Sequence, residues 1–262
     1  MVKYIKTIHQ NINRRNRMRD YKEEFEKRVQ FIKDCLADAH CSAIVFGNSG
    51  GKDSALVGIL CKAACENTLG VMMPCQSKRN FGEDMEDGMA VAQQFHIDNI
   101  TVDLTAAKEA IMDSIGETMD VSEAASKNIA PRLRMTTVYA IGQTMGALVA
   151  GTGNRSERYT GYFTKWGDGA FDFNPISDLN VGEIYEFLEY LGAPENIIKK
   201  APSAGLFEGQ TDEKEMGVTY AAIDKYIMTG EGTPEDVAII KRMHDASAHK
   251  RTGSRHYREI VE

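Results

Sequence analysis

Apolar residues along the chain follow two alternating patterns. Short runs of consecutive apolar residues, typical of strands buried on both faces, occur at 43–46, 68–73, 99–103 and 146–150. Apolar residues spaced three and four apart predict helices at 20–39, 55–60, 83–95, 106–115, 128–142 and 181–191, with two more helices towards the C-terminus. Strands that alternate with helices indicate an α/β fold, a doubly wound parallel sheet with right-handed crossovers and flanking helices. We expect one domain spanning residues 1–262.

Several local signals refine these elements. Pro131 is expected in the first turn of the 128–142 helix, where its missing N–H costs nothing. Thr233 is expected to cap the last long helix, with Pro234 at its first position. Residues 166–178 and 201–217 are rich in glycine and polar residues and are expected to be loops. A loop as long as 201–217 in a compact domain is usually functional or disordered.

The first strand runs into a turn of small and polar residues, Ser49-Gly-Gly-Lys-Asp-Ser54, which precedes a helix. A strand, a glycine-rich turn and a helix N-terminus form an anion site, because the backbone N–H groups there are unpaired and the helix dipole favours negative charge. The turn is not a Walker A loop: Phe46 occupies the position of its first glycine, and Asp53 stands where Ser or Thr is needed. A second glycine-rich turn follows the fourth strand. In parallel sheets, ligands bind at the carboxyl ends of the strands, where both turns lie.

Composition limits the possible functions. A net charge of −7 argues against a general nucleic-acid binder, so an anionic ligand would need a local basic cluster. No secretory signal and no apolar run of about 18 residues is found, so we expect a soluble protein of the cytoplasm. Five cysteines speak against a disulfide framework. Cys61 and Cys65 share a helix face and could chelate a metal, but buried free thiols are the better interpretation.

Two motifs resemble known families. The 49–54 turn resembles the S-G-G-x-D-S loop of the ATP pyrophosphatases, which holds the β,γ-pyrophosphate of ATP. Residues 151–157 (GTGNRSE) with 161–169 (GYFTKWGDG) closely resemble the signature of the NAD synthetases. Further stretches fit the same family, and they are Arg132-Leu-Arg-Met135, 174–179, 202–206, 208–213 and His249-Lys250. The resemblance extends over roughly residues 44 to 251 and implies a Rossmann-like ATP pyrophosphatase fold.

The resemblance implies a two-step reaction. The nicotinate carboxylate of deamido-NAD attacks the α-phosphorus of ATP, and ammonia then displaces AMP to give NAD. The implied ATP-binding positions are Gly47, Asn48, Ser49, Gly50, Gly51, Lys52, Asp53, Ser54, Thr152 and Ser203. The implied Mg²⁺ ligands are Asp53 and Glu157, and the implied deamido-NAD contacts are Arg132, Lys165, Asp172, His249 and Lys250. No further catalytic side chain is implied, and Asp168 is interpreted as a turn former.

The chain departs from the family pattern at two places. The family usually has a lysine at the position of Val181, where it touches the ATP phosphates, and Lys-Ala where this chain has Ala130-Pro131. Conversely, the variable position of the first turn, often uncharged in the family, is Lys52 here. We hypothesise that Lys52 supplies the phosphate charge that is absent at Val181.

Three further expectations follow from the resemblance. About 40 residues precede the first strand, too few for the amidase domain of glutamine-using relatives, so ammonia should be the nitrogen source. The family also implies a homodimer with the dinucleotide site at the subunit interface, near the Arg132 helix. We expect the 201–217 loop to be a lid that orders over ATP and excludes water.

Other functions remain open at this point. One is another adenylating or thiolating pyrophosphatase acting on a base or a tRNA, and another is a module that binds nucleotides without turnover. A dinucleotide-binding oxidoreductase is disfavoured because no G-x-G-x-x-G follows the first strand. Taken singly, Glu157, Arg132 and Lys165 could also be ordinary surface charges.

Overall fold

The fold is built on one parallel sheet of four strands, described by a computed structural model for residues 19–76, 81–200, 212–254 and 257. The strands are β1 (Ala43–Gly47), β2 (Thr68–Met72), β3 (Asp98–Thr101) and β4 (Ala147–Ala150). Their order across the sheet is β3-β2-β1-β4, and every neighbouring pair is parallel. All four predicted strands and the doubly wound class are therefore confirmed.

The two faces of the sheet are covered by different helices. Ile44 and Phe46 of β1 are buried with α3 (Lys52–Ala64), whereas Val45 between them is buried with α7 (Glu123–Met145). α5 (Glu83–Gln94) packs against β2 and β3, and α6 (Thr105–Gly116) packs against α7. Because strand side chains alternate in direction, a continuous apolar run gives β1 two buried faces. This explains why the central strand contains no charged residue.

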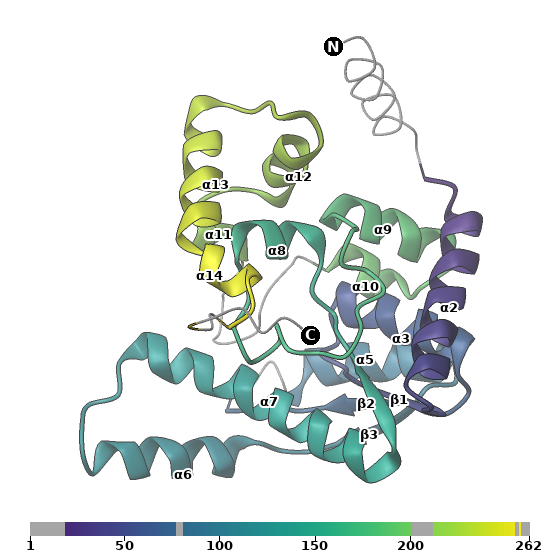
Figure 1. Cartoon of the computed structure of the whole chain (residues 1–262), viewed down its shortest axis with the longest axis horizontal. Coiled ribbons are helices and arrows are strands. Elements are labelled where there is room, and N and C mark those ends of the chain that lie inside the picture. The colour runs from purple at the N-terminus through teal and green to yellow at the C-terminus, as the bar shows by residue number, and fades with distance from the viewer. Residues whose placement is uncertain (1–18, 77–80, 201–211, 255–256, 258–262) are drawn as a thin grey trace.

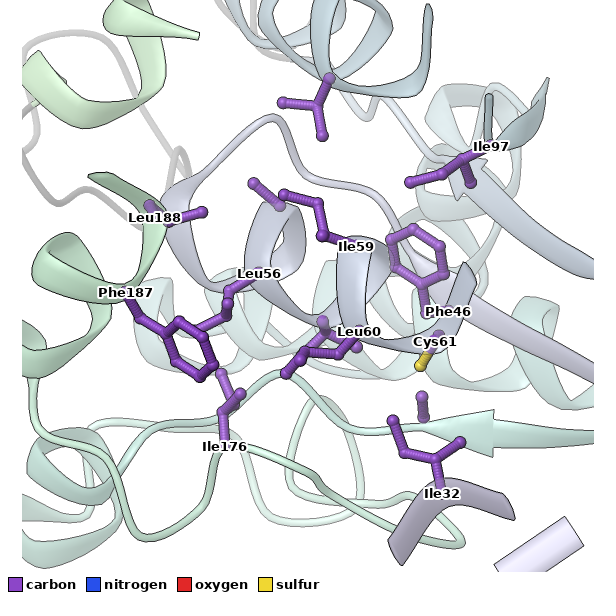
Figure 2. Packing of buried hydrophobic residues seen from close by; sticks show 14 of the residues in the cluster. Ile32, Phe46, Leu56, Ile59, Leu60, Cys61, Ile97, Ile176, Phe187 and Leu188 are labelled. Atoms are coloured by element: carbon purple, nitrogen blue, oxygen red, sulfur yellow. The ribbon is translucent and has the colours of Figure 1, made fainter. Parts of the chain in front are cut away.

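The larger core lies around α3, which is buried along most of its length. Beyond α3 pack α2 (Tyr21–Asp38), α9 (Val181–Tyr190) and the short α10 (Glu195–Lys199). Figure 2 shows Leu56 and Leu60 of α3 beside Phe187 of α9 and Ile176 of the preceding loop, with Ile32 of α2 nearby. Full burial of side chains of this size contributes about 1.5–3 kcal/mol each. α3 is thereby held rigidly behind the turn that precedes it.

α7 differs from the helix predicted from the sequence. It begins at Glu123, five residues before the expected start, and Ser122 caps it by accepting a hydrogen bond from the Ala125 N–H at 3.3 Å. Pro131 therefore lies inside the helix rather than in its first turn, which corrects the sequence prediction. The proline ring removes one intrahelical hydrogen bond, a cost that a capped helix of 23 residues packed on β1 and β4 tolerates.

The C-terminal helices form a separate layer with its own core. α8 (Arg155–Thr160), α11 (Asp212–Met216), α12 (Tyr220–Thr229), α13 (Pro234–Ala246) and α14 (Ala248–Arg251) follow β4 along the chain. Ile223 of α12 and Ile240 of α13 are fully buried in a cluster that also contains Val181. Thr233 caps α13 with Pro234 at its start, as predicted. The expected 201–217 loop is corrected in part, because α11 occupies its last third; residues 201–211 lie outside the described residues.

Helix α2 is attached to the loop before α9 by ion pairs between the largely buried Arg28 and the more exposed Asp178. The Arg28 guanidinium contacts the Asp178 carboxylate through Nη1 at 2.6 Å and Nη2 at 2.9 Å, and Nη2 also contacts Glu24 at 2.6 Å. The Arg28 side chain is only 10% exposed. These contacts hold the 174–180 stretch, which runs beside the second glycine-rich turn.

Two remaining sequence expectations concern membranes and cysteines. Within the described ranges, no helix is both long and apolar enough to cross a lipid bilayer. All five cysteines are free thiols, and Cys61 is buried while Cys65 is half-buried. The described part of the chain contains no cluster of three or more residues suited to holding a metal through His, Cys, Asp or Glu.

Candidate active site

The two glycine-rich turns meet at one edge of the sheet. β1 and β4 are neighbours, so the turns that follow them emerge side by side, where the chain passes from one half of the sheet to the other. The Asn154 amide of the second turn donates to Asp53 Oδ1 of the first at 3.0 Å. Both turns line a cavity of about 660 Å³. The sequence prediction that the two turns form one site agrees with this geometry.

Buried polar contacts hold the first turn against α5 and β3. Gly50 has φ +70°, and a Cβ there would lie 1.9 Å from the Asp84 carbonyl oxygen of α5, so only glycine fits. The buried Asn48 side chain donates to the Gly88 carbonyl at 3.2 Å and to Asn99 Oδ1 at 2.9 Å. Its own Oδ1 accepts the Gly50 N–H at 3.2 Å. These contacts fix the turn against α5 and β3 before any ligand binds.

The side of the same turn that faces the cavity carries the start of α3 and two hydroxyl groups. α3 begins directly after Gly51, and no side chain caps its first turn. The Ser49 and Ser54 hydroxyls lie 3.1 Å apart and both line the cavity. Within the described residues, the N–H groups of the first turn of α3 have no acceptor, and together with the positive end of a helix dipole of 13 residues and the two hydroxyl groups they form a site for phosphate.

Lys52 is buried within this site. Its side chain is 6% exposed, and its ammonium group lies 2.7 Å from Asp53 Oδ2, 5.6 Å from the centre of the Tyr220 ring and 6.0 Å from that of Tyr185. Burial disfavours the charged ammonium, but the Asp53 and Glu157 carboxylates outweigh it and raise the pKa of Lys52. The group is therefore a cation at neutral pH, placed beside the phosphate-binding turn.

Glu157 is the second carboxylate of the site. It is the third residue of α8 and forms a capping box with Asn154: its Oε2 accepts the Asn154 N–H at 3.0 Å, and its own N–H donates to Asn154 Oδ1 at 3.0 Å. Burial, together with the nearby Asp53 carboxylate, raises the pKa of Glu157 well above its ordinary value. One residue, Asn154, thus orients both carboxylates that the family resemblance implies as metal ligands.

The donor set fits a magnesium ion. Asp53 and Glu157 both line the cavity, and Mg²⁺ prefers carboxylate oxygens together with phosphate and water. Within the described residues, Oε1 of Glu157 accepts no hydrogen bond, so one oxygen is available for a ligand. Burial, and after it the Asp53 carboxylate, raises the pKa of Glu157, so a bound cation would favour its ionised form.

The implied dinucleotide residues separate into two groups. Lys165 donates to the His249 carbonyl at 2.6 Å, and an Arg132 N–H donates to the Lys165 carbonyl at 3.4 Å, so these three residues lie together. Lys250 lines the cavity and donates to the Gly161 and Phe163 carbonyls, both at 2.7 Å. Burial lowers the pKa of Lys250, although the nearby Asp168 opposes this.

Asp172 stands apart from that group. Its carboxylate accepts the Val149 N–H at 2.8 Å and the Tyr139 hydroxyl at 3.1 Å, contacts that fasten the loop to β4. Thr152 lines the cavity, as expected of an ATP-binding residue, whereas Ser203 lies outside the described residues. Asp168 also lines the cavity, and its carboxylate accepts the Thr164 N–H at 3.0 Å, so it does act as a turn residue.

The structure adds residues that sequence reasoning missed. Lys200 and Asp212 line the cavity from the two ends of the segment 201–211. The Tyr220 hydroxyl donates to Asp212 Oδ2 at 3.1 Å. Lys199-Lys200 reads as ordinary surface charge at the end of a helix, so no sequence signal distinguished Lys200. Only the packing of α10 against α3 brings it to the first turn.

Comparison with known proteins gives consistent results. The family model described as NAD synthase matches residues 24–259. An NH₃-dependent NAD⁺ synthetase of Carboxydothermus hydrogenoformans is 47% identical over 235 residues, which cover 88% of this chain and 96% of the relative. An NMN synthetase structure from Francisella tularensis has a TM-score of 0.86 at 34% identity, covering 91% of this chain and 99% of that one. An NH₃-dependent NAD synthetase from Campylobacter jejuni has a TM-score of 0.75 at 29% identity and covers 94% and 100%.

Proposed function

The chain belongs to the NAD synthase family, and from this premise we propose that it joins ammonia to the nicotinate carboxylate of deamido-NAD at the expense of ATP. The products are NAD, AMP and pyrophosphate, and the reaction class is a ligase that forms a C–N bond. The observation that carries the proposal is the Asn154–Asp53 contact, because it joins a phosphate-binding turn to the turn that bears the NAD synthetase signature.

The first step activates the substrate carboxylate. One carboxylate oxygen attacks the α-phosphorus of ATP, a C(O)–O–P bond forms, and the bond to the β-phosphate breaks to release pyrophosphate. The unpaired N–H groups at the start of α3 and the hydroxyls of Ser49 and Ser54 would hold the leaving phosphates. Because such a transition state needs positioning and charge neutralisation more than covalent help, these donors suffice.

Asp53 and Glu157 are the residues that would hold Mg²⁺. When bound there, the ion would supply positive charge to the phosphate oxygens. The part played by this chain is to orient the two carboxylates through Asn154 and to keep Lys52 beside them.

The second step forms the amide. Ammonia adds to the acyl carbon, the C–N bond forms, the C–O bond to AMP breaks and the nitrogen loses a proton. Ammonia must be neutral to attack, so the rate should rise with the fraction of ammonia that is unprotonated. Lys250, which lines the cavity, would contact the dinucleotide, together with Lys165 and His249, which lie beside each other outside the lining residues.

The decisive experiment compares nitrogen sources. The purified chain should form NAD from deamido-NAD, ATP and Mg²⁺ when given an ammonium salt, and release one pyrophosphate for each NAD. Glutamine in place of the ammonium salt should give none. NAD formation from glutamine alone would contradict the ammonia dependence, and absence of pyrophosphate release with either source would contradict the ligase assignment.

A second candidate is favoured by one specific observation. The Francisella tularensis structure with a TM-score of 0.86 is named an NMN synthetase, so the smaller nicotinate mononucleotide is a rival acceptor. The same chemistry would amidate either molecule, because the reacting carboxylate is identical. Measuring kcat/KM for deamido-NAD and for nicotinate mononucleotide under identical conditions decides between them, and we expect deamido-NAD to be preferred.

We also propose that the chain acts as a homodimer. α6 has no buried residue in this single chain, and Ala107, Ala110 and Ile111 form an exposed apolar strip along it. Figure 1 shows α6 beside α7, which carries Arg132, in an arm that extends to the left of the body. A second copy of the chain would cover this strip close to the dinucleotide residues.

A further inference from the structure

Lys200 lies at the first turn although it belongs to no phosphate-binding motif. Its Nζ lies 2.8 Å from Asp84 Oδ1, 2.5 Å from Asp87 Oδ2 and 3.4 Å from the Gly50 carbonyl oxygen. The side chains of Lys200, Asp84 and Asp87 are only 9%, 12% and 9% exposed. We call Lys200, Asp84, Asp87 and the Gly50 carbonyl the Lys200 clamp.

The clamp leaves Lys200 no donor for a ligand. An ammonium group has three N–H bonds, and each is directed to one of the three oxygens of the clamp. To bind a phosphate itself, Lys200 would have to give up a buried carboxylate, which is costly. The main chain of Lys200 is fixed as well, because the Tyr185 hydroxyl donates to its carbonyl at 2.7 Å. A direct ligand role is therefore disfavoured, although Lys200 lines the cavity.

The contact with Gly50 controls the direction of the next N–H group. In a trans peptide, the Gly50 carbonyl and the Gly51 N–H lie in one plane and point in opposite directions. Holding the carbonyl against Lys200 therefore fixes the Gly51 N–H, which lies 3.3 Å from the hydroxyl oxygen of Ser49. Ser49 and Gly51 both line the cavity. Gly50 has no side chain and φ +70°, so its own backbone resists rotation little.

We propose that Lys200 is a positioning residue for the triphosphate of ATP, acting through the Gly50–Gly51 peptide and not by touching the nucleotide. This rests on the proposed function, which places the β- and γ-phosphates of ATP on the first turn. Removing the clamp should free the peptide to rotate and weaken triphosphate binding, with little effect on the rest of the nucleotide.

The test measures binding of ATP and of AMP by calorimetry to the full chain and its variants. Lys200→Met should raise the Kd for ATP about tenfold, while the Kd for AMP, which lacks the β- and γ-phosphates, stays within about twofold. Lys199→Met is the matched control: Lys199 precedes Lys200, its side chain is 73% exposed, and among the residues that the structure describes it pairs only with Glu195. This control should bind ATP as the unchanged chain does.

A second variant separates positioning from stability. Lys200→Met removes the ammonium group that contacts the two buried aspartates and should lower Tm. The double variant Lys200→Met/Asp87→Asn keeps the net charge of the clamp at minus one, so its Tm should recover, yet its Kd for ATP should stay raised. A double variant that binds ATP like the unchanged chain overturns the proposal, as does an equal loss of ATP and AMP affinity.

These outcomes are distinguishable from failure of the proposed function. If the unchanged chain binds ATP but forms no NAD from deamido-NAD and ammonium, the proposed function fails while the clamp is still tested by ATP binding. If it forms NAD and both Lys200 variants bind ATP normally, the clamp fails and the proposed function stands.

Discussion

Lys52 places a positive charge in the phosphate site at a position that is often uncharged in the family. Its ammonium group is buried against Asp53 and lies 6.0 Å from the ring centre of Tyr185, which follows Val181 by one turn of α9. A phosphate of ATP could replace Asp53 as the partner of Lys52, because charge-assisted contacts of either kind are comparable in strength. This geometry supports the hypothesis that Lys52 supplies the charge absent at Val181.

Replacing Lys52 with glutamine tests that hypothesis. Lys52→Gln should raise the KM for ATP about tenfold and lower turnover, because a buried cation beside the phosphates is lost. Steady-state kinetics with ATP varied measures the effect, and a thermal melt checks that the variant is folded. Lys27→Gln, at a lysine whose side chain is 65% exposed, is the control and should leave both constants unchanged. Unaltered ATP affinity and turnover in Lys52→Gln would reject the hypothesis that Lys52 supplies the charge absent at Val181.

Among single residues, those of the first turn could be identified from the sequence, whereas the distant residues that contact the turn could not. Ser49, Gly50, Gly51 and Asp53 were predictable because a glycine-rich turn between a strand and a helix has a local signature. Lys200 was not, because its role depends on α10 packing next to α3, and a contact between residues 150 positions apart leaves no local pattern. Asp172 was assigned to the dinucleotide by motif, and its observed hydrogen bonds to Val149 and Tyr139 are ones that no motif encodes.

At the scale of elements, ion pairs from Arg28 and Arg19 to Asp178 help to hold the 174–180 loop beside α2. Burial opposes ionisation of Asp178, but the hydrogen bonds and charge of Arg28, aided by Arg19, outweigh it and lower the pKa of Asp178. A carboxyl group with a lowered folded-state pKa binds its proton more weakly in the folded than in the unfolded chain. The contribution of the Asp178 ion pairs to the free energy of unfolding is therefore complete above the ordinary pKa of about 3.9. It is lost as pH falls through the lower folded-state pKa.

Asp178→Asn should accordingly destabilise the chain at neutral pH and less so in acid. We expect a loss of about 1 kcal/mol in the free energy of unfolding at pH 7, because Arg28 loses the Asp178 carboxylate, which is 55% exposed and therefore partly screened by solvent, but keeps Glu24 as a partner. Urea denaturation at pH 7 and at the lowest pH where both proteins remain folded measures the difference. Glu23→Gln, which breaks the exposed pair with Lys27, serves as control and should change stability little. If the difference in unfolding free energy between the two proteins stays constant or grows towards acid pH, the ionised Asp178 is not what stabilises the loop.

The start of α7 was predicted five residues too late, at 128 instead of Glu123. Proline was interpreted as a helix start, because the first turn is where its missing N–H is harmless. The real start is marked by Ser122 followed by Glu123, a weaker signal that a proline nine residues into the helix obscured. Packing of α7 on β1 and β4 offsets the lost hydrogen bond, and the Pro131 ring becomes part of the cavity wall.

For the whole molecule, the parallel, doubly wound class of the sheet was predictable from the sequence, whereas the strand order and the assembly were not. Alternating strands and helices with consistent handedness leave few possible sheets, and both glycine-rich turns must then lie at the carboxyl ends of the strands. That β1 and β4 are adjacent, so that the turns touch, comes from the order β3-β2-β1-β4. Which exposed surface meets a second copy depends on side chains that look like any other surface residues in the sequence.

The exposed strip on α6 makes the assembly testable. If a second copy covers it, Ile111→Lys should place a charge in an apolar interface and raise the dimer dissociation constant by roughly tenfold or more. Affinity for deamido-NAD should fall with it, while ATP affinity should not, because the phosphate-binding residues come from one chain. Light scattering across a dilution series, with calorimetry for each ligand, measures these effects.

Ile100→Lys provides the matched control for this prediction. Ile100 lies on the edge strand β3 and is 41% exposed, close to the 37% of Ile111, so both changes put a lysine at a similarly exposed isoleucine. The β3 variant should remain a dimer and bind deamido-NAD normally. Dissociation caused by Ile100→Lys but not by Ile111→Lys would move the interface from the α6–α7 arm to the sheet edge. The Arg132 helix would then lie away from the contact between subunits, because β3 and β4 are at opposite edges of the sheet and α7 packs on β1 and β4.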